Sequence, residues 1–348
     1  MTSCRCTHPM ALAAAVLATA VLGGALMAAD ALKLPQAWDL SPPFVSPAPA
    51  AARGCISVKD PTVVFHEGRW HLFMTVRSAA PPVHMEYVSF EKWEDADKAP
   101  RHVLKWHDRY FCAPQVFYFR PLKKWCLVYQ VGQPQRTLQL QPALVTTETL
   151  GDPASWSAPR LFFPDTDPKG VSKWLDFWVI CDERRAYLFF TTLDGHLWRM
   201  WTPLEKFPDG FDHCELALRA DIFEASHTYR MTGQGGGYLT VVEAQGRGGR
   251  RYYKAYRADR LDGEWRPLAD TEDRPFAGAA NVRGGAALWA DNISHGELLR
   301  AGNDETLPVD PADLRFLIQA ASDKEKAGKG YGDIPWRLGI LTPAAKAE

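Results

Sequence analysis

Apolar and polar residues alternate in short runs along most of the chain, and four segments repeat one plan. Each begins with a polar residue, continues through a short apolar run and a polar turn, and ends in a second, aromatic-rich run. The segments occupy residues 60–76, 115–130, 176–192 and 224–244. Alternating runs of this length on either side of a turn are typical of β-hairpins. Each segment is therefore predicted to form an antiparallel pair of strands.

The hairpins recur at a regular distance. Their leading residues are Asp60, Gln115, Asp176 and Glu224, and a fifth unit is expected from Asn281 through the stretch ISHGELLR, with spacings of 48 to 61 residues. A strand unit repeated five times, with little apolar spacing of the helical kind, favours sheets arranged around an axis. We therefore predict an all-β fold, a five-bladed β-propeller. A β-sandwich or two β domains would also show regular hairpins.

Three regions are predicted along the chain. Residues 1–29 resemble a signal peptide, because Arg5 precedes an apolar run that ends in small residues. The run is just long enough for a membrane anchor to be the alternative. Residues 30–56 are rich in Pro and Ala and are expected to form an extended arm crossing the surface. Residues 57–345 would form the propeller, secreted or periplasmic, with no membrane contact after signal removal.

Composition narrows the classes of partner. The net charge is −1, so strong attraction to nucleic acid or an anionic membrane is excluded. Apolar residues make up 46% of the chain, which is ample for a core. Of seven cysteines, Cys4 and Cys6 precede the expected cleavage site, and none lies in a CxxC pair. One or two disulfides are possible among the remaining five, and a zinc knuckle is not supported.

Three of the four leading residues are carboxylates. Asp60, Asp176 and Glu224 would each enter the innermost strand of a blade and converge at the axis. Hydrolysis of a glycosidic bond needs one carboxylic acid to protonate the leaving oxygen and one carboxylate to activate water or attack. A third carboxylate raises the pKa of the acid by its charge. The alternative is that these side chains cap turns or pair with Lys and Arg, as most acidic residues do.

A series of ordered motifs resembles glycoside hydrolase family 62. They read ISVKDPTVVFHEGRWHLF, CAPQVFYF, WLDFWVICD, YLFFT, FEASHTY, PFAGAANV, ISHGELLR and YGDIPWRLGILT. The resemblance extends from about Leu34 to Thr342, nearly the whole of the expected mature chain. It implies a five-bladed propeller with α-L-arabinofuranosidase activity.

The resemblance also implies roles for individual residues. Asp60 matches the general base, Glu224 the general acid, and Asp176 the carboxyl group that tunes the acid and orients the substrate. Inversion of the anomeric configuration is implied, for which base and acid stand ~6.5 to 9.5 Å apart. His295 matches a residue beside a central metal ion, usually calcium, although a buried core histidine is the alternative. No organic cofactor is expected.

Four further residues are predicted to bind substrate. Gln115 is a candidate hydrogen-bonding partner for a sugar hydroxyl, Trp174 a candidate stacking residue beside Asp176, and Lys59 a neighbour of the base. Tyr331 matches an aromatic residue at the edge of the family's pocket. The chain departs from the family at Phe111 and Cys112, where Arg and Ala are common, and at Gly332, where Asn is usual.

The expected function is that of a secreted, inverting α-L-arabinofuranosidase acting as a monomer on plant cell-wall polysaccharide, either arabinoxylan or arabinan. One alternative is a propeller glycosidase of the family 43 type, a xylosidase or arabinanase. The other is a sugar-binding propeller without catalysis. The FEAS and WLDFWVICD motifs favour the first reading, and the three carboxylates argue against a purely binding protein.

Overall fold

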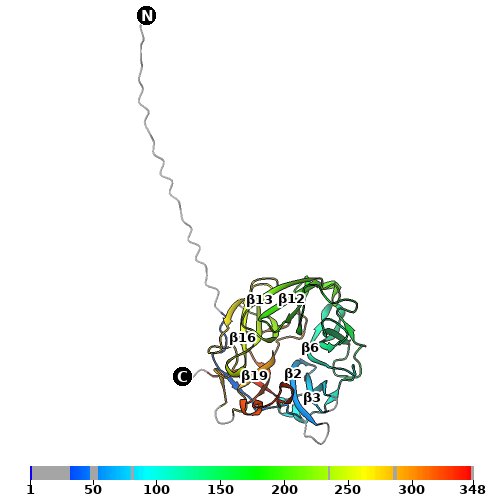
Figure 1. Ribbon diagram of the computed structural model, residues 1–348, viewed down its shortest axis with the longest axis vertical. Helices are drawn as coiled ribbons and strands as arrows, with labels where there is room; N and C mark the ends of the chain where they lie inside the picture. Colours follow the sequence, from blue (N-terminus) through cyan, green and yellow to red (C-terminus); the bar gives the residue numbers. More distant parts are fainter. Residues whose placement is uncertain (2–31, 48–53, 80–81, 234–235, 285–287, 346–348) are drawn as a thin grey trace. The chain divides into compact units, whose positions relative to one another are not determined.

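The computed structural model describes residues 1, 32–47, 54–79, 82–233, 236–284 and 288–345. Strands form five sheets that surround a common axis, each with one strand innermost (Figure 1). The prediction of an all-β, five-bladed propeller is confirmed. The predicted signal peptide, residues 1–29, lies outside the described residues except for Met1. Among the residues described, no helix is both long and apolar enough to cross a membrane.

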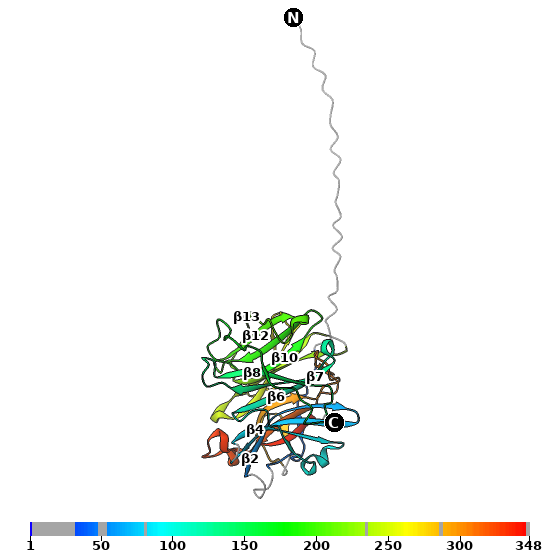
Figure 2. The same ribbon diagram turned by 90° about the vertical axis from the view of Figure 1, so that its right-hand side faces the viewer.

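The first three blades each have four antiparallel strands that run from the axis outward in sequence order. Blade I contains β2 (Cys55–His66), β3 (Arg69–Ser78), β4 (Val83–Phe90) and β5 (His102–Val103). Blade II contains β6 (Phe111–Phe119), β7 (Lys124–Gly132), β8 (Leu140–Thr147) and β9 (Arg160–Leu161). Blade III contains β10 (Leu175–Cys181), β11 (Arg185–Thr191), β12 (His196–Pro203) and β13 (His213–Arg219). Viewed from the side, blades III, II and I follow one another from top to bottom (Figure 2).

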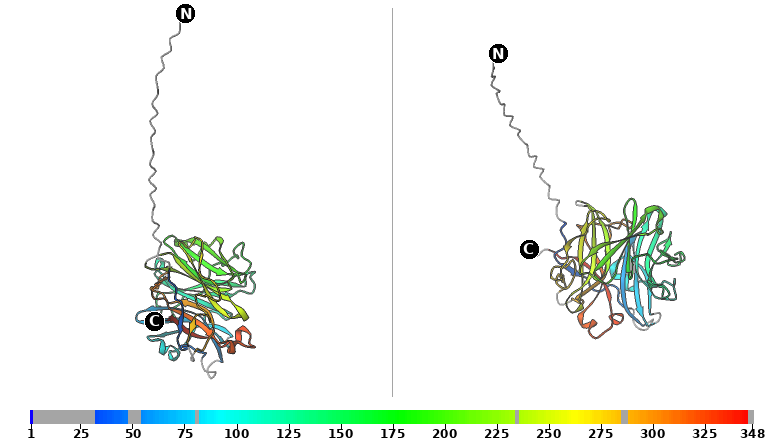
Figure 3. Two further views of the ribbon diagram at one scale, coloured as in Figure 1. Left: turned by 90° about the vertical axis from the view of Figure 1, so that its left-hand side faces the viewer. Right: turned by 45° about the horizontal axis from the view of Figure 1, so that its top comes forward.

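The last two blades each include strands from other parts of the chain. Blade IV contains β14 (Glu224–Met231), β15 (Tyr238–Gln245), β16 (Arg251–Ala258), β17 (Arg266–Ala269) and, beside β14, the parallel strand β20 (Pro308–Val309). Blade V contains β19 (Asn292–Leu298), β21 (Phe316–Ala321), β22 (Arg337–Pro343), β1 (Trp38–Leu40) and β18 (Val282–Arg283). Figure 3 shows the yellow-green strands of blade IV beside the green strands of blade III.

The remaining elements described are short and lie between strands. They are η1 (Trp93–Lys98), η2 (Arg120–Leu122), η3 (Leu204–Lys206), η4 (Arg247–Gly249), α1 (Asp323–Lys326) and η6 (Tyr331–Asp333).

Blade V closes the ring with a strand from the N-terminal arm. β1 pairs antiparallel with β22 and parallel with β18. Trp38 is fully buried there, and its indole N–H donates to the carbonyl of Phe276 at 2.5 Å. The segment expected to be a surface arm thus contributes β1 to the propeller, and the predicted boundary at residue 57 falls inside β2. A pairing between the two ends of the chain leaves no local sequence signal.

The position expected for the fifth repeat was wrong. Asn281 lies in the loop before β18, where its carbonyl accepts the backbone N–H of Trp38 at 2.8 Å. The innermost strand of blade V instead begins at Asn292. The described cysteines form no disulfide with one another, although one or two were possible, and three of them are buried.

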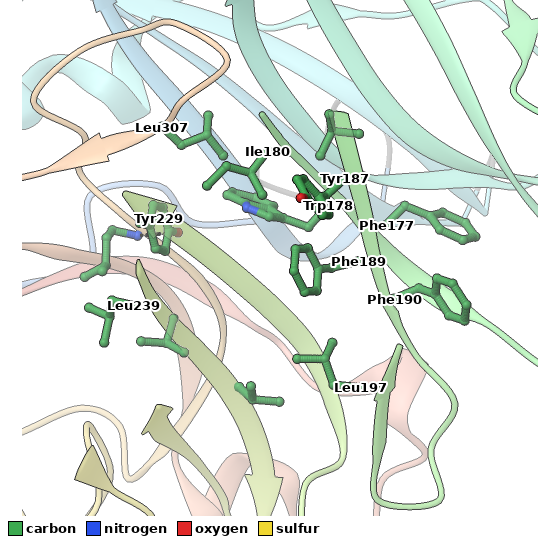
Figure 4. Packing of buried hydrophobic residues seen from close by; sticks show 14 of the residues in the cluster. Phe177, Trp178, Ile180, Tyr187, Phe189, Phe190, Leu197, Tyr229, Leu239 and Leu307 are labelled. Carbon is green, nitrogen blue, oxygen red and sulfur yellow. Dashed lines mark hydrogen bonds between the residues drawn. The ribbon is translucent and has the colours of Figure 1, made fainter. Parts of the chain in front are cut away.

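Large apolar side chains fill the spaces between adjacent blades. Between blades III and IV, Trp178, Tyr187, Phe189 and Tyr229 are buried to 2% exposure or less (Figure 4). The indole of Trp178 also donates to the carbonyl of Thr228 at 2.8 Å, which links β10 to β14. Aromatic residues of this size contribute most of the buried apolar area in such a core. Sheet faces packed in this way fix the position of each innermost strand.

We predict that Trp38→Ala lowers the free energy of unfolding by about 3–5 kcal/mol, because the truncation empties a fully buried site and removes a hydrogen bond to Phe276 in the loop before β18. Denaturant unfolding measures the loss. The matched control is Asp39→Ala in the same strand, whose side chain is exposed, with an expected change within about 0.5 kcal/mol. Equal losses in both variants would contradict closure by Trp38.

Candidate active site

The innermost strand of every blade carries a β-bulge at the same level. The register shifts between Lys59 and Thr62, and matching shifts occur in β6, β10, β14 and β19. The bulge residues are Asp60, Ala113, Asp176, Ala225 and His295. The first four have φ between 46° and 55°, left-handed values that non-glycine residues seldom adopt. Bulges re-aim side chains, and here they interrupt the strands where the predicted acids lie.

Each bulge is held by the blade before it. The backbone N–H groups of Asp60, Ala113, Asp176 and His295 donate to side chains in the second strand of the preceding blade, which are, in order, Gln319 at 2.8 Å, Thr75 at 2.9 Å, Gln130 at 3.1 Å and Glu243 at 2.8 Å. These four side chains and Thr191 pair with the last residue before each bulge. We call these five residues the second-strand ring.

In blade III the second-strand residue, Thr191, does not accept the N–H of the next bulge, and Asp176 takes its place. The hydroxyl of Thr191 has no hydrogen-bond partner among the described residues. The N–H of Ala225 donates instead to the carboxylate of Asp176 at 3.1 Å. Asp176 therefore fixes the backbone immediately after Glu224.

The three predicted carboxylates are brought together at this level. Asp60 and Asp176 are 5% and 7% exposed. Burial, followed by the charges of Glu224 and Asp60, holds the pKa of Asp176 well above its ordinary value. His295 also lies here, with Nδ1 3.4 Å from the carboxylate of Asp60. Burial lowers the pKa of His295, so its imidazole is neutral at pH 7.

Glu224 shares one cation with a second acidic residue. Nη1 of Arg251 lies 3.0 Å from Glu224 and 2.5 Å from Glu243. Burial and the charge of Glu243 raise the pKa of Glu224 to about 7, against the opposing effect of Arg251. Near neutral pH the group therefore still carries its proton in a substantial fraction of molecules, as a general acid requires.

Lys59 and Tyr331 form one side of the site. The ammonium of Lys59 lies 4.6 Å from the centre of the Tyr331 ring, and the guanidinium of Arg251 lies 5.6 Å from it. Tyr331 remains 42% exposed, whereas Lys59 is 8% exposed. Simple strand alternation would turn Lys59 away from Asp60, but the bulge breaks that alternation. Their roles in binding substrate stay predictions.

Two predicted substrate-binding residues are structural instead. The amide of Gln115 donates to the carbonyl of Val179 and accepts its N–H, both at 2.7 Å, so it links β6 to β10. Trp174 is 2% exposed and packs against Phe177 and Phe190. Neither side chain is open to a polymer. Gln115 lies two residues after Ala113, the bulge residue of its blade, so it does not occupy the position that Asp60 occupies in blade I.

Several residues at the site were not predicted from the sequence. The thiol of Cys112 donates to the hydroxyl of Tyr110 and accepts the Gln130 amide, both at 3.1 Å. Tyr110 is 43% exposed, and the charges of Cys112, Asp60 and Asp176 contribute to raising its pKa. The departure from the family at Cys112 therefore lies close to Asp60. Arg251 and the second-strand ring lie in no sequence motif. A weak signal was nevertheless present, because Thr75, Gln130 and Thr191 each follow a leading residue by fifteen positions.

The site offers few protein ligands to a metal ion. Among the described residues no group of three or more His, Cys, Asp or Glu is arranged to hold one. Nδ1 of His295 faces Asp60, which leaves Nε2 as the nitrogen that a cation could bind. The residues therefore fit an ion coordinated mainly by water, and not a cage of carboxylates of the kind calcium commonly takes.

A five-bladed propeller with buried carboxylates converging at its axis defines a class, the propeller glycoside hydrolases. Comparison with known families gives the same class. The sequence model described as glycosyl hydrolase family 62 matches residues 45–342. The chain belongs to this family.

Relatives support the assignment. The chain is 39% identical over 319 residues to α-L-arabinofuranosidase C of Cellvibrio japonicus, a match that covers 89% of this chain and 47% of that protein. The chain thus spans about half the length of this curated relative. The solved catalytic domain of a Coprinopsis cinerea family 62 α-L-arabinofuranosidase is 38% identical, with a TM-score of 0.80 over 88% of this chain and 97% of that one.

Other solved structures extend the comparison. The α-L-arabinofuranosidase of Podospora anserina, solved with cellotriose, is 36% identical, with a TM-score of 0.80 over 88% of this chain and 96% of that one. The Bacillus subtilis arabinanase is only 12% identical, with a TM-score of 0.54 over 86% of this chain and 96% of that one. That second likeness shows a shared fold alone.

The raised pKa of Glu224 makes a prediction about stability. The unfolded value is near 4.5 and the folded value about 7, so the folded state binds more protons and stability falls as pH rises through this window. Glu224→Gln removes that penalty. We expect the variant to melt above the wild type at pH 8 and close to it at pH 4.5.

Thermal unfolding across this pH range measures the difference. The control is Glu183→Gln, an exposed side chain in the turn between β10 and β11, whose effect on the melting temperature should be small throughout this range. A constant difference for Glu224→Gln as well would contradict the raised pKa.

Proposed function

We propose that this chain is an inverting α-L-arabinofuranosidase, secreted or periplasmic, that acts as a monomer and removes single arabinofuranose side chains from arabinoxylan or arabinan. The observation that carries the proposal is the surroundings of Glu224, which is buried and shares Arg251 with Glu243. A buried glutamic acid with a pKa of about 7 lies among two further carboxylates that the family resemblance assigns to catalysis. The names of the relatives support the choice of sugar.

In the proposed reaction Glu224 donates its proton to the glycosidic oxygen as the bond to the anomeric carbon breaks. Asp60 removes a proton from water, whose oxygen bonds to the opposite face of that carbon. The configuration inverts, and the two protons are re-equilibrated through solvent. Asp176 accepts the backbone N–H of Ala225 and so holds the chain next to Glu224. Lys59 and Tyr331 line the pocket that receives the sugar.

We predict that incubation with arabinoxylan or branched arabinan releases arabinose as the main product, with the β-anomer formed first. Chromatography identifies the sugar, and proton NMR during the first minutes identifies the anomer. Release of xylose or of arabinan oligosaccharides would favour a family 43 type of activity. Binding without release would favour a non-catalytic propeller.

Glu224→Gln tests the acid itself. The amide cannot protonate a leaving oxygen, so kcat on polymer should fall by about 10²- to 10⁴-fold. A nitrophenyl arabinofuranoside needs little protonation, so its hydrolysis should fall much less. Initial rates on both substrates make the comparison, with Glu183→Gln as the control expected to match the wild type. Equal losses on both substrates would exclude the acid role.

We also propose that Nε2 of His295 binds a largely hydrated calcium ion. An ion that binds only the folded state stabilises it, by about 2.7 kcal/mol at 100 times its dissociation constant. Chelator should therefore lower the melting temperature of the wild type, and should not lower that of His295→Ala. An unchanged wild-type melting curve, with no calcium found by elemental analysis, would return His295 to a structural role.

A further inference from the structure

Glu243 is the most deeply buried carboxylate at the site, and the proposed reaction does not use it. The side chain is fully buried on β15. Its oxygens accept the guanidinium of Arg251 at 2.5 Å, the hydroxyl of Ser294 at 3.0 Å and the N–H of His295 at 2.8 Å. Glu243 is also the one charged member of the second-strand ring, whose other members are Gln and Thr.

We propose that Glu243 is a positioning residue that keeps Glu224 in its proton-carrying form by competing with it for Arg251. The inference rests on the proposed function, in which Glu224 is the general acid. Glu243 touches neither the reacting atoms nor the expected position of the sugar, so its effect on the reaction passes through Arg251.

The competition follows from geometry. One nitrogen of Arg251, Nη1, faces both carboxylates. Glu243 is fully buried and accepts three donors, of which Arg251 is the nearest. Glu224 has Arg251 as its donor, and its side chain is 14% exposed. The charge of Arg251 is therefore largely neutralised by Glu243, and Glu224 is left near a negative group. The pKa of Glu224, about 7, agrees with this.

Other charged or titratable groups face Glu224 from each element packed around it. They are Asp60 on β2, Asp176 on β10, Glu243 on β15, Arg251 on β16 and Tyr331 on η6, whose ring is contacted by Lys59. Asp60 and Asp176 are assigned to the reaction, and Lys59 and Tyr331 line the pocket. Glu243 is thus the negative group whose charge can be removed without removing a group assigned to catalysis.

A second path links Glu243 to the base. The hydroxyl of Ser294, which donates to Glu243, accepts the amide of Gln319 at 3.1 Å. The same amide accepts the backbone N–H of Asp60 at 2.8 Å. A hydrogen-bonded chain therefore runs from the acid to the backbone of the base across blades IV, V and I. Through it, Glu243 positions both ends of the catalytic pair.

The test is Glu243→Gln, which keeps the shape and removes the charge. Arg251 then forms an ion pair with Glu224 alone, so the pKa of Glu224 should fall by about one pH unit. The alkaline limb of the pH profile of kcat/KM should move down by the same amount. Carbon-13 NMR titration of glutamate carboxyls, assigned with Glu224→Gln, measures the pKa without substrate.

The matched control is Glu297→Gln. Glu297 is also fully buried and pairs with Arg300 at 2.7 Å. Its loss should lower stability and leave both the alkaline limb and the Glu224 titration unchanged. Equal downward shifts in the two variants would mean a general effect of destabilisation, and would overturn the proposal.

A second variant covers the case in which Glu243→Gln does not fold. Arg251→Gln removes the shared cation, so the pKa of Glu224 should rise instead of fall. An unchanged Glu224 titration in either variant that folds overturns the role of Glu243. If the wild type released no arabinose, the proposed function would fail, while the NMR titration would still decide whether Glu243 controls Glu224.

Discussion

The site depends on one repeated interaction, the capture of a bulge N–H by the preceding blade. Five innermost strands bulge at one level, and four of the bulges are capped by the second strand of the blade before them. A backbone N–H buried without a partner is costly, so each blade needs its neighbour to complete it. The dependence runs around the ring, from Gln319 in blade V to Asp60 in blade I. Closure of blade V by β1 therefore supports the geometry of the base as well as overall stability.

The ring of bulges also brings several carboxylates together in a buried part of the propeller. Asp60, Asp176, Glu224 and Glu243 all lie at this level, with Arg251 and Lys59 as the nearby cations. A carboxylate loses its hydration when it is buried, which costs free energy. It lowers that cost by pairing with a cation, by accepting hydrogen bonds or by keeping a proton. Glu243 accepts donors, whereas Asp176 and Glu224 have raised pKa values. The fold thereby separates the roles of chemically similar groups through their surroundings alone.

Sequence reasoning succeeded where the signal was local or repeated. Hairpin alternation and regular spacing predicted the propeller, and the leading carboxylates pointed to the pocket. It failed where a bulge changes the phase of a strand. Gln115 was aligned with Asp60, yet lies two residues beyond the equivalent Ala113, and its amide binds Val179. Trp174 was chosen for its nearness to Asp176 in sequence, but its ring belongs to the core. The pairing of β1 and the partners of Arg251 are long-range contacts that no local pattern encodes.

The backbone conformation of the bulges suits two of the three acids, Asp60 and Asp176. A left-handed φ costs a non-glycine residue about 1–2 kcal/mol, and Asp tolerates it better than most residues. Asp60 and Asp176 occupy this conformation with φ of 46° and 55°. Ala113 and Ala225 adopt it as well, so the chain retains the strain even where the side chain has no chemistry to perform. Glycine would relieve it, but the added freedom of the unfolded chain offsets that gain. The five bulges thus act as one structural ring, which supplies Asp60 and Asp176 from two of its positions and places Glu224 directly before a third.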